Sequence, residues 1–180
     1  MGNLTGIAFK LEKFGKMIIC DSANVTTKTG VAQDVRGGKG KRQVTVLDKQ
    51  RYQDACKEIG KELDWTIRRA NLLIEGIDLF QSKGKYLCVN ELVLEITGET
   101  TPCYRMDEQC EGLKTALIPE WRGGVCCRVI RGGEIKIGDT ITITNDDPTH
   151  RSNFTRWMVN CSDDIRKMKR KSSKLLGLSK

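Results

Sequence analysis

The sequence of 180 residues contains only one histidine, His150, and 6% aromatic residues. A single histidine nearly excludes Cys/His metal cages and catalytic triads, which need an imidazole as ligand or base. With so few aromatic residues, no segment resembles the strands that stack bases in an RNA-recognition motif. The eight cysteines include no C-x-x-C pair, so neither a zinc ribbon nor a thioredoxin-type redox site is supported.

Long hydrophobic runs are missing as well. No stretch reaches the roughly 18–20 apolar residues that a membrane helix requires, and residues 71–80 are interrupted by Glu75, Gly76 and Asp78. The first ten residues show no basic segment followed by an apolar one, so no secretory signal is expected. These features predict a cytoplasmic protein without a membrane segment, in which most thiols stay reduced and pack as small hydrophobes.

The net charge of +8 comes almost entirely from the C-terminus. Residues 166–180 carry seven basic and no acidic side chains, whereas the rest of the chain is nearly neutral. Such a tail could bind nucleic acid or an acidic surface, but a solvated terminal helix is the simpler interpretation. We therefore expect a β-barrel domain over residues 1–160 and a short basic C-terminal helix over residues 161–180, with nucleic-acid binding disfavoured.

Hydrophobic periodicity predicts a mainly β fold with a few helices. Residues 43–47 alternate and are β-branched, which is typical of a strand, and Asp48 then caps a helix. Further strands are expected over residues 70–79, as a pair over residues 86–97, and over residues 122–144. About six to eight short strands at this spacing indicate a β-barrel rather than a parallel sheet.

Two details of this fold are specific enough to be tested. Residues 135–143 alternate on either side of a Gly138-Asp139 turn, which predicts a hairpin. Apolar residues at helical spacing predict one helix over residues 106–117, although Gly112 lowers its stability by ~1 kcal/mol relative to alanine.

A glycine-rich basic loop precedes the strand over residues 43–47. Residues 36–42 read Arg-Gly-Gly-Lys-Gly-Lys-Arg, so their backbone N–H groups can converge among four cations, as phosphate binding requires. The loop is not a P-loop, because Arg42 follows the Gly40-Lys41 pair where Ser or Thr is needed. An exposed flexible loop explains the pattern equally well, and both interpretations stay open.

Two other segments combine arginine with a neighbouring structural element. Arg68, Arg69 and Asn71 lead directly into an apolar strand, and guanidinium groups suit bidentate binding of phosphate or carboxylate. An internal ion pair at the mouth of a barrel is an equally ready explanation. Residues 122–128 add a glycine bend flanked by arginines, whose two adjacent cysteines point to opposite faces of a strand and are expected to pack in the core.

The most informative cysteine is Cys103, which follows a proline. Pro102 favours an extended residue before it, so Cys103 is expected at a rigid bend between a strand and a helix. The positive end of the helix dipole and the neighbouring Arg105 would both favour the thiolate, which is the reactive and metal-binding form. A buried structural cysteine is the alternative.

Several of these motifs together resemble the molybdenum-cofactor sulfurase C-terminal (MOSC) domain, in particular its stand-alone bacterial, YiiM-like members. Each motif alone is weak, but their order along the chain is specific. The resemblance covers roughly residues 25–145 and is carried by Arg42–Leu47, Asp64–Thr66, Arg68–Gly76, Pro102–Asp107, Gly123–Val125, Gly132–Ile135 and Gly138–Asp139.

This resemblance implies a β-barrel that binds molybdenum cofactor (molybdopterin) or carries sulfur on one cysteine. The family cysteine corresponds to Cys103, which in reductases of the family is thought to ligate molybdenum while N-hydroxylated compounds are reduced. A soft thiolate suits molybdenum, and the phosphate of the pterin needs cations and backbone donors. The candidates for binding that phosphate are Arg36, Arg42, Arg69, Asn71 and Arg122.

The resemblance also implies an alternative function and two kinds of partner. As a sulfur carrier, the chain would hold a persulfide on Cys103 for metal–sulfur cluster or cofactor assembly, supplied by a cysteine desulfurase. As a reductase, it would need a separate electron-donor protein, because the sequence has no iron–sulfur motif. Residues 33–36 depart from the family pattern, and nothing in the chain supplies the Schiff-base site for pyridoxal phosphate that the eukaryotic fusions carry upstream.

Overall fold

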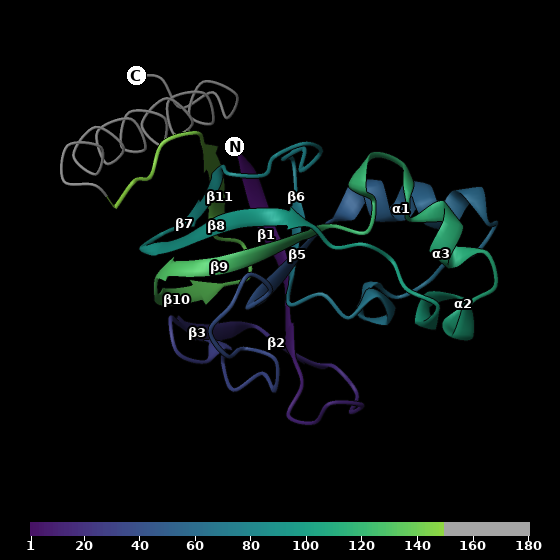
Figure 1. Cartoon of the computed structure of the whole chain (residues 1–180), viewed down its shortest axis with the longest axis horizontal. Helices are drawn as coiled ribbons and strands as arrows, with labels where there is room; N and C mark the ends of the chain where they lie inside the picture. The colour runs from purple at the N-terminus through teal and green to yellow at the C-terminus, as the bar shows by residue number, and fades with distance from the viewer. Residues whose placement is uncertain (150–180) are drawn as a thin grey trace, which may run out of the picture. The chain divides into compact units, whose positions relative to one another are not determined.

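Seven strands close into a barrel in the computed structural model, which describes residues 1–149 (Figure 1). Strand β1 pairs with β6 on one side and with β11 on the other, and this second pairing closes the ring. The barrel strands are β1 (Gly2–Phe9), β5 (Val44–Asp48), β6 (Leu72–Glu75), β7 (Tyr86–Val89), β8 (Leu92–Glu99), β9 (Val125–Arg131) and β11 (Thr140–Thr144). The predicted mainly β, barrel-like fold with a few helices is confirmed.

The N-terminal strands were not predicted from the sequence. Besides β1, they are β2 (Ile18–Cys20), which pairs with β1, and β3 (Ser22–Thr26) and β4 (Gly30–Val31), which form a small second sheet with β10 (Gly133–Lys136). The strand predicted over residues 70–79 is shorter, because Gly76 adopts a φ of +82° and ends β6.

The predicted hairpin around Gly138-Asp139 is wrong. Strand β10 pairs with β3, whereas β11 pairs with β7 and β1. The turn itself is bonded to β1, since Gly138 N donates to Leu4 O and Leu4 N donates to Asp139 O. This attachment directs β11 into the barrel beside β1 and leaves β10 to the second sheet.

The barrel interior is filled by the apolar side chains of alternating strand positions. Val44 and Val46 of β5 are buried there, as are Leu92, Leu94 and Ile96 on one face of β8. Each of these five side chains is at most 1% exposed to solvent. The period of two in the sequence is therefore the period of burial in the sheet.

Helix α1 (Lys49–Glu58) begins where the sequence indicated. The carboxylate of Asp48 accepts hydrogen bonds from the backbone N–H groups of Gln50 and Arg51, which would otherwise have no partner inside the helix. Its buried face contributes Tyr52 and Ala55 to a second apolar cluster outside the barrel.

The single helix predicted over residues 106–117 is two short helices, α2 (Arg105–Gln109) and α3 (Leu113–Ala116). They are separated at Gly112, whose φ of +83° is incompatible with a continuous right-handed helix. Met106 and Leu113 are nevertheless buried in the same cluster as α1, so the apolar face was predicted correctly.

Strand pairing brings three distant segments to one edge of the barrel. Short 3-10 helix η1 (Trp65–Arg68) leads into β6, which runs parallel to β5. The end of β8 pairs with the beginning of β9 at Glu99 and Val125, beside Val46 of β5. The Thr97 hydroxyl also donates to Lys41 O, which ties the glycine-rich loop to β8.

Several sequence predictions fall on residues that the structure does not describe or concern the chain as a whole. His150, Cys161 and the predicted basic helix over residues 161–180 lie outside the described residues, as does the predicted boundary at residue 160. Within residues 1–149 the cysteines are free thiols. No helix in that part of the chain is long and apolar enough to cross a membrane.

Candidate functional site

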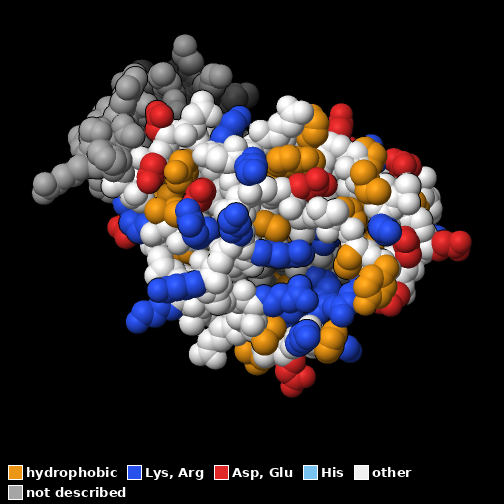
Figure 2. All heavy atoms as spheres, in the orientation of Figure 1, with side chains coloured by type: hydrophobic (Ala, Val, Ile, Leu, Met, Phe, Trp, Pro, Cys, Tyr) orange, Lys and Arg blue, Asp and Glu red, His pale blue; other side chains and the backbone are white. Residues whose placement is uncertain are grey.

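A cavity of about 300 Å³ opens where the glycine-rich loop, the end of η1 and the connection that follows β8 meet. It is lined by Cys103 and by five arginines, and Figure 2 shows basic side chains gathered around a hollow beside the short helices. The arginines are Arg36, Arg42, Arg68, Arg69 and Arg105. None of the ion pairs among residues 1–149 involves any of these five side chains, so no carboxylate of that part of the chain neutralises their charge.

Cys103 lies on the connection between β8 and α2. Pro102 is buried, while the cysteine after it is exposed and its backbone carbonyl accepts a hydrogen bond from Met106 N at 2.9 Å. Its sulfur is close enough to Arg68, Arg69 and Arg105 for Coulombic interaction with each guanidinium group. The alternative of a buried structural cysteine at this position is therefore wrong.

Arg68 forms the floor of the cavity and is 5% exposed. Its Nη2 donates to Thr100 O at 2.6 Å, but its buried Nε has no hydrogen-bond partner. The pKa of this guanidinium is lowered to about 10, chiefly by burial and in addition by the positive charge of Arg42. A buried cation with an unused donor and no carboxylate beside it is the arrangement that an anion completes.

Gly123 makes room for the Arg68 side chain. A Cβ atom at this glycine would lie 3.1 Å from Arg68 Nη2 and 2.7 Å from Thr100 O. Any larger residue would therefore displace the guanidinium or the backbone that anchors it. This packing accounts for the first glycine of the Gly123-Gly124 pair in the family-like motif.

Buried polar side chains hold the glycine-rich loop in place through hydrogen bonds. Asp34 accepts hydrogen bonds from Lys10 N at 3.0 Å and from Arg36 N at 2.8 Å. The Gln43 amide donates to Gly37 O at 2.9 Å, also inside the protein. The loop that carries Arg36 and Arg42 is thus anchored at both ends, although both arginines are exposed.

The structure brings four of the six predicted site residues together and separates two. Cys103, Arg36, Arg42 and Arg69 line the cavity. Asn71 is buried and does not line it.

The amide oxygen of Asn71 accepts from Thr45 N and Oγ1, and its Nδ2 donates to Ala8 O and Asp34 Oδ2. Because Asp34 also binds the backbone of Arg36, Asn71 helps to position the glycine-rich loop. Arg122 pairs with Glu58 and also donates to Ala116 O, away from the cavity lining.

Arg68 and Arg105 are cavity residues that were absent from the predicted phosphate-binding set. Arg68 stood in the sequence next to Arg69, and only the structure reveals that it is buried and that its Nε has no hydrogen-bond partner. The internal ion pair considered for this arginine pair is wrong, because neither Arg68 nor Arg69 lies at ion-pair distance from a carboxylate of residues 1–149. Cys126 and Cys127 are both buried as expected, and burial raises the pKa of Cys127 well above its usual range.

Arg69 adopts a left-handed backbone conformation, with φ 62° and ψ 33°, that turns the chain from η1 into β6. This conformation costs a non-glycine residue ~1–2 kcal/mol. We expect Arg69→Gly to be about 1 kcal/mol more stable than Arg69→Ala in urea unfolding, because only glycine relieves the strain. Both variants lose the side chain, so both should bind inorganic phosphate more weakly than wild type. Equal stability of the two variants would contradict this assignment of strain.

Comparison of the sequence with protein-family models identifies the domain family. The model described as the MOSC domain matches residues 32–142, which include barrel strands β5 to β9, part of β11 and every residue that lines the Cys103 cavity, but not β1. The chain belongs to the MOSC family. The resemblance predicted from the ordered motifs is thereby confirmed.

Solved structures of low sequence identity share the fold of this MOSC protein. The YuaD protein from Bacillus subtilis is 19% identical, with a TM-score of 0.68 over 79% of this chain and 96% of that one. YiiM from Escherichia coli is 13% identical, with a TM-score of 0.62 over 81% of this chain and 71% of that one. YiiM from Geobacillus stearothermophilus is also 13% identical, with a TM-score of 0.62 over 80% of this chain and 75% of that one. A search of curated proteins found no match.

Proposed function

We propose that this MOSC protein binds molybdenum cofactor in the Cys103 cavity and reduces N-hydroxylated compounds there. The observation that carries the proposal is an exposed thiol beside five guanidinium groups that form no ion pair with a carboxylate in the described part of the chain. One of these groups, Arg68, is buried with an unused Nε donor. The thiol supports metal ligation, and the guanidinium groups support binding of the cofactor's phosphate.

The residues present fit this cofactor in its charge and in its ligand type. Among residues 1–149, no group of three or more His, Cys, Asp or Glu side chains could hold a metal ion. The metal would therefore have Cys103 as its protein ligand, with its other ligands from the cofactor itself. Arg36, Arg42, Arg68 and Arg69 would hold the phosphate, the last two from the floor and wall of the cavity. When bound, the cofactor supplies the redox chemistry that amino-acid side chains lack.

The reaction defines what the protein must provide around the cofactor. Reduction of an N-hydroxyl group breaks the N–O bond, forms an N–H bond and releases water, and it consumes two electrons and two protons. We propose that a separate electron-donor protein supplies the electrons. The arginines bind and orient the anionic cofactor, while the exposed position of Cys103 leaves the reacting side of the cavity open to substrate.

A sulfur carrier is the second candidate function, favoured by the accessibility of Cys103. No other cysteine of residues 1–149 lines the cavity, so no neighbouring thiol can attack a persulfide there, form a disulfide with Cys103 and release the outer sulfur as sulfide. A cysteine desulfurase would supply the sulfur. Incubation with the desulfurase should then add about 32 Da at Cys103, as measured by mass spectrometry.

Metal and pterin analysis of freshly purified protein separates these functions. In a host that makes the cofactor, we expect wild type to contain molybdenum and pterin. The molybdenum content of Cys103→Ala should be at least about tenfold lower than that of wild type, because the protein ligand of the metal is gone. Cys110→Ala is the matched control, since Cys110 is half-buried and lies outside the cavity. An empty wild type, or equal molybdenum in wild type and Cys103→Ala, would refute the proposal.

A further inference from the structure

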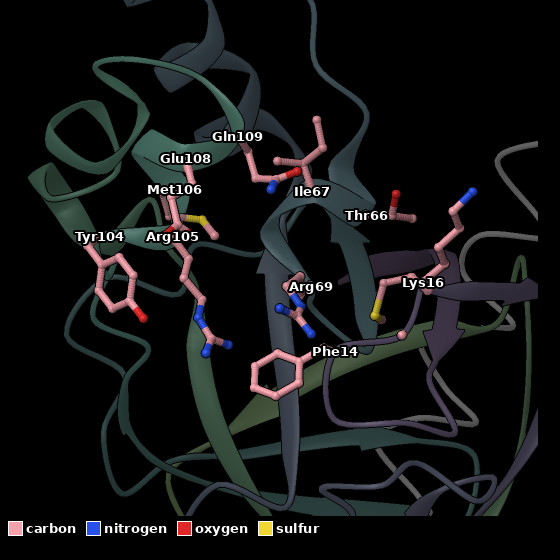
Figure 3. Close-up of a pocket in the computed structure, with 12 residues that line it drawn as sticks. Phe14, Lys16, Thr66, Ile67, Arg69, Tyr104, Arg105, Met106, Glu108 and Gln109 are labelled. Atoms are coloured by element: carbon pink, nitrogen blue, oxygen red, sulfur yellow. The ribbon is translucent and has the colours of Figure 1, made fainter.

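A second and larger cavity, of about 560 Å³, adjoins the Cys103 cavity (Figure 3). Four residues line both cavities, namely Arg69, Tyr104, Arg105 and Met106. A molecule bound in the larger cavity therefore reaches the wall of the smaller one beside Cys103. The phosphate-binding role proposed above uses the smaller cavity and leaves the larger one unassigned.

The larger cavity has aromatic walls around a guanidinium group. Phe14 is 68% exposed, on the segment between β1 and β2, and the guanidinium carbon of Arg105 lies 4.8 Å from the centre of its ring. The same carbon lies 5.9 Å from the centre of the Tyr104 ring. Figure 3 shows the Phe14 ring and the guanidinium groups of Arg105 and Arg69 converging on one space. Such flat surfaces stack well on a planar ring.

The charge of the larger cavity is mainly positive. Lys16, Arg69 and Arg105 line it together with one carboxylate, Glu108. Glu108 interacts with Arg105 through space but does not approach any of the three cations within ion-pair distance. Arg69 donates through Nη2 to Lys13 O at 3.0 Å, which fixes the Phe14 segment and leaves its other N–H groups to a ligand.

From this combination we propose that the larger cavity binds the substrate of the Cys103 site, and that the substrate is a planar aromatic compound bearing a carboxylate. The ring stacks on Phe14, and the carboxylate accepts hydrogen bonds from the guanidinium groups of Arg105 and Arg69, which lie beside that ring in Figure 3. This inference rests on the proposed reductase function for the fate of the substrate. The binding itself depends only on residues of this chain.

Binding of two matched probes tests the inference by isothermal titration calorimetry. Naphthalene-2-carboxylate should bind the purified protein about tenfold more tightly than the neutral naphthalene-2-carboxamide, which has the same ring but no charge. Arg105→Gln should remove most of that preference. Phe14→Leu should weaken both probes, whereas Phe80→Leu, which changes an exposed ring outside the cavity, should weaken neither.

Other variants separate this inference from rival explanations. Arg42 lines only the smaller cavity, so Arg42→Gln should leave binding of the carboxylate probe unchanged. Loss of binding in Arg42→Gln but not in Arg105→Gln would place the probe in the smaller cavity and overturn the inference, as would equal affinity for the two probes.

Cys103→Ala should retain probe binding even if it loses molybdenum. Failure of the metal analysis and failure of the probe test are therefore distinguishable.

Discussion

Replacement of Arg68 by methionine should make the protein more stable and at the same time abolish anion binding. Arg68 is a buried guanidinium whose pKa is lowered to about 10, chiefly by burial, and its Nε has no partner. A pKa this far below the ordinary arginine value corresponds to a cost of about 3 kcal/mol for the charged form. Methionine removes that cost, but it also removes the hydrogen bond to Thr100 O, so the expected net gain is about 1–2 kcal/mol.

The pH dependence of this gain has a definite sign. Because the folded-state pKa of Arg68 lies below its unfolded value, the unfolded state binds more protons between the two values, and wild-type stability rises with pH there. Below about pH 10 both states are protonated and the cost is present in full. The advantage of Arg68→Met should therefore be complete at neutral pH and shrink only in strong alkali.

Thermal and urea unfolding with and without inorganic phosphate measure both effects. Phosphate should raise the melting temperature of wild type but leave that of Arg68→Met unchanged, since the ligand stabilises only a protein that binds it. Arg128→Met is the matched control, because Arg128 is an exposed arginine paired with Glu95 on the barrel. A less stable Arg68→Met protein that still responds to phosphate would show that Arg68 is structural rather than part of an anion site.

Substitution of Gly37 by alanine should be the most damaging single change in the glycine-rich loop. A Cβ atom there would lie 1.6 Å from Thr29 O and 2.4 Å from Thr29 C, both of which are backbone atoms. The loop cannot simply shift, because Gly37 N donates to Asp34 O and Gly37 O accepts from Gln43. We expect a loss of at least about 3 kcal/mol in the free energy of unfolding, at the upper end of overpacking costs.

Gly38 provides a control one residue away. A Cβ atom at Gly38 would meet nothing within 4 Å, so Gly38→Ala should change stability by no more than about 0.5 kcal/mol. Phosphate affinity should fall in Gly37→Ala, as Arg36 and Arg42 move with the loop, and stay unchanged in Gly38→Ala. Similar urea-unfolding curves for the two variants would mean that the loop is flexible, which is the alternative that the sequence left open.

Much of the fold was predictable because it follows local rules. The β-branched alternation before Asp48 predicted β5, and the capping carboxylate predicted the start of α1. The hairpin prediction failed because a Gly-Asp turn specifies only a reversal of the chain. The backbone hydrogen bonds between this turn and Leu4 place β11 in the barrel, whereas β10 joins the second sheet.

The site was predictable in part, for a similar reason. Cys103 stood out because it follows Pro102, which restricts the backbone at the end of the strand and so predicts a rigid bend. The arginines stood out because they form clusters along the chain. Asn71 and Arg122 belonged to the same clusters, yet hydrogen bonds within the protein and an ion pair with Glu58 occupy them elsewhere. The second cavity was invisible in the sequence, because its walls come from residues 14–17, 66–69 and 104–109.

The sequence by itself determined that this chain is a MOSC barrel with a thiol at a proline-linked bend, because periodicity and ordered motifs are properties of neighbouring residues. Only the tertiary structure decided which charges are unpaired. Whether an arginine meets a carboxylate, a backbone carbonyl or an open cavity depends on strands far apart in sequence, and burial then sets its energy. Arg68 and Arg122 are the same residue type in similar motifs, and only packing places Arg68 on the floor of the Cys103 cavity and pairs Arg122 with Glu58.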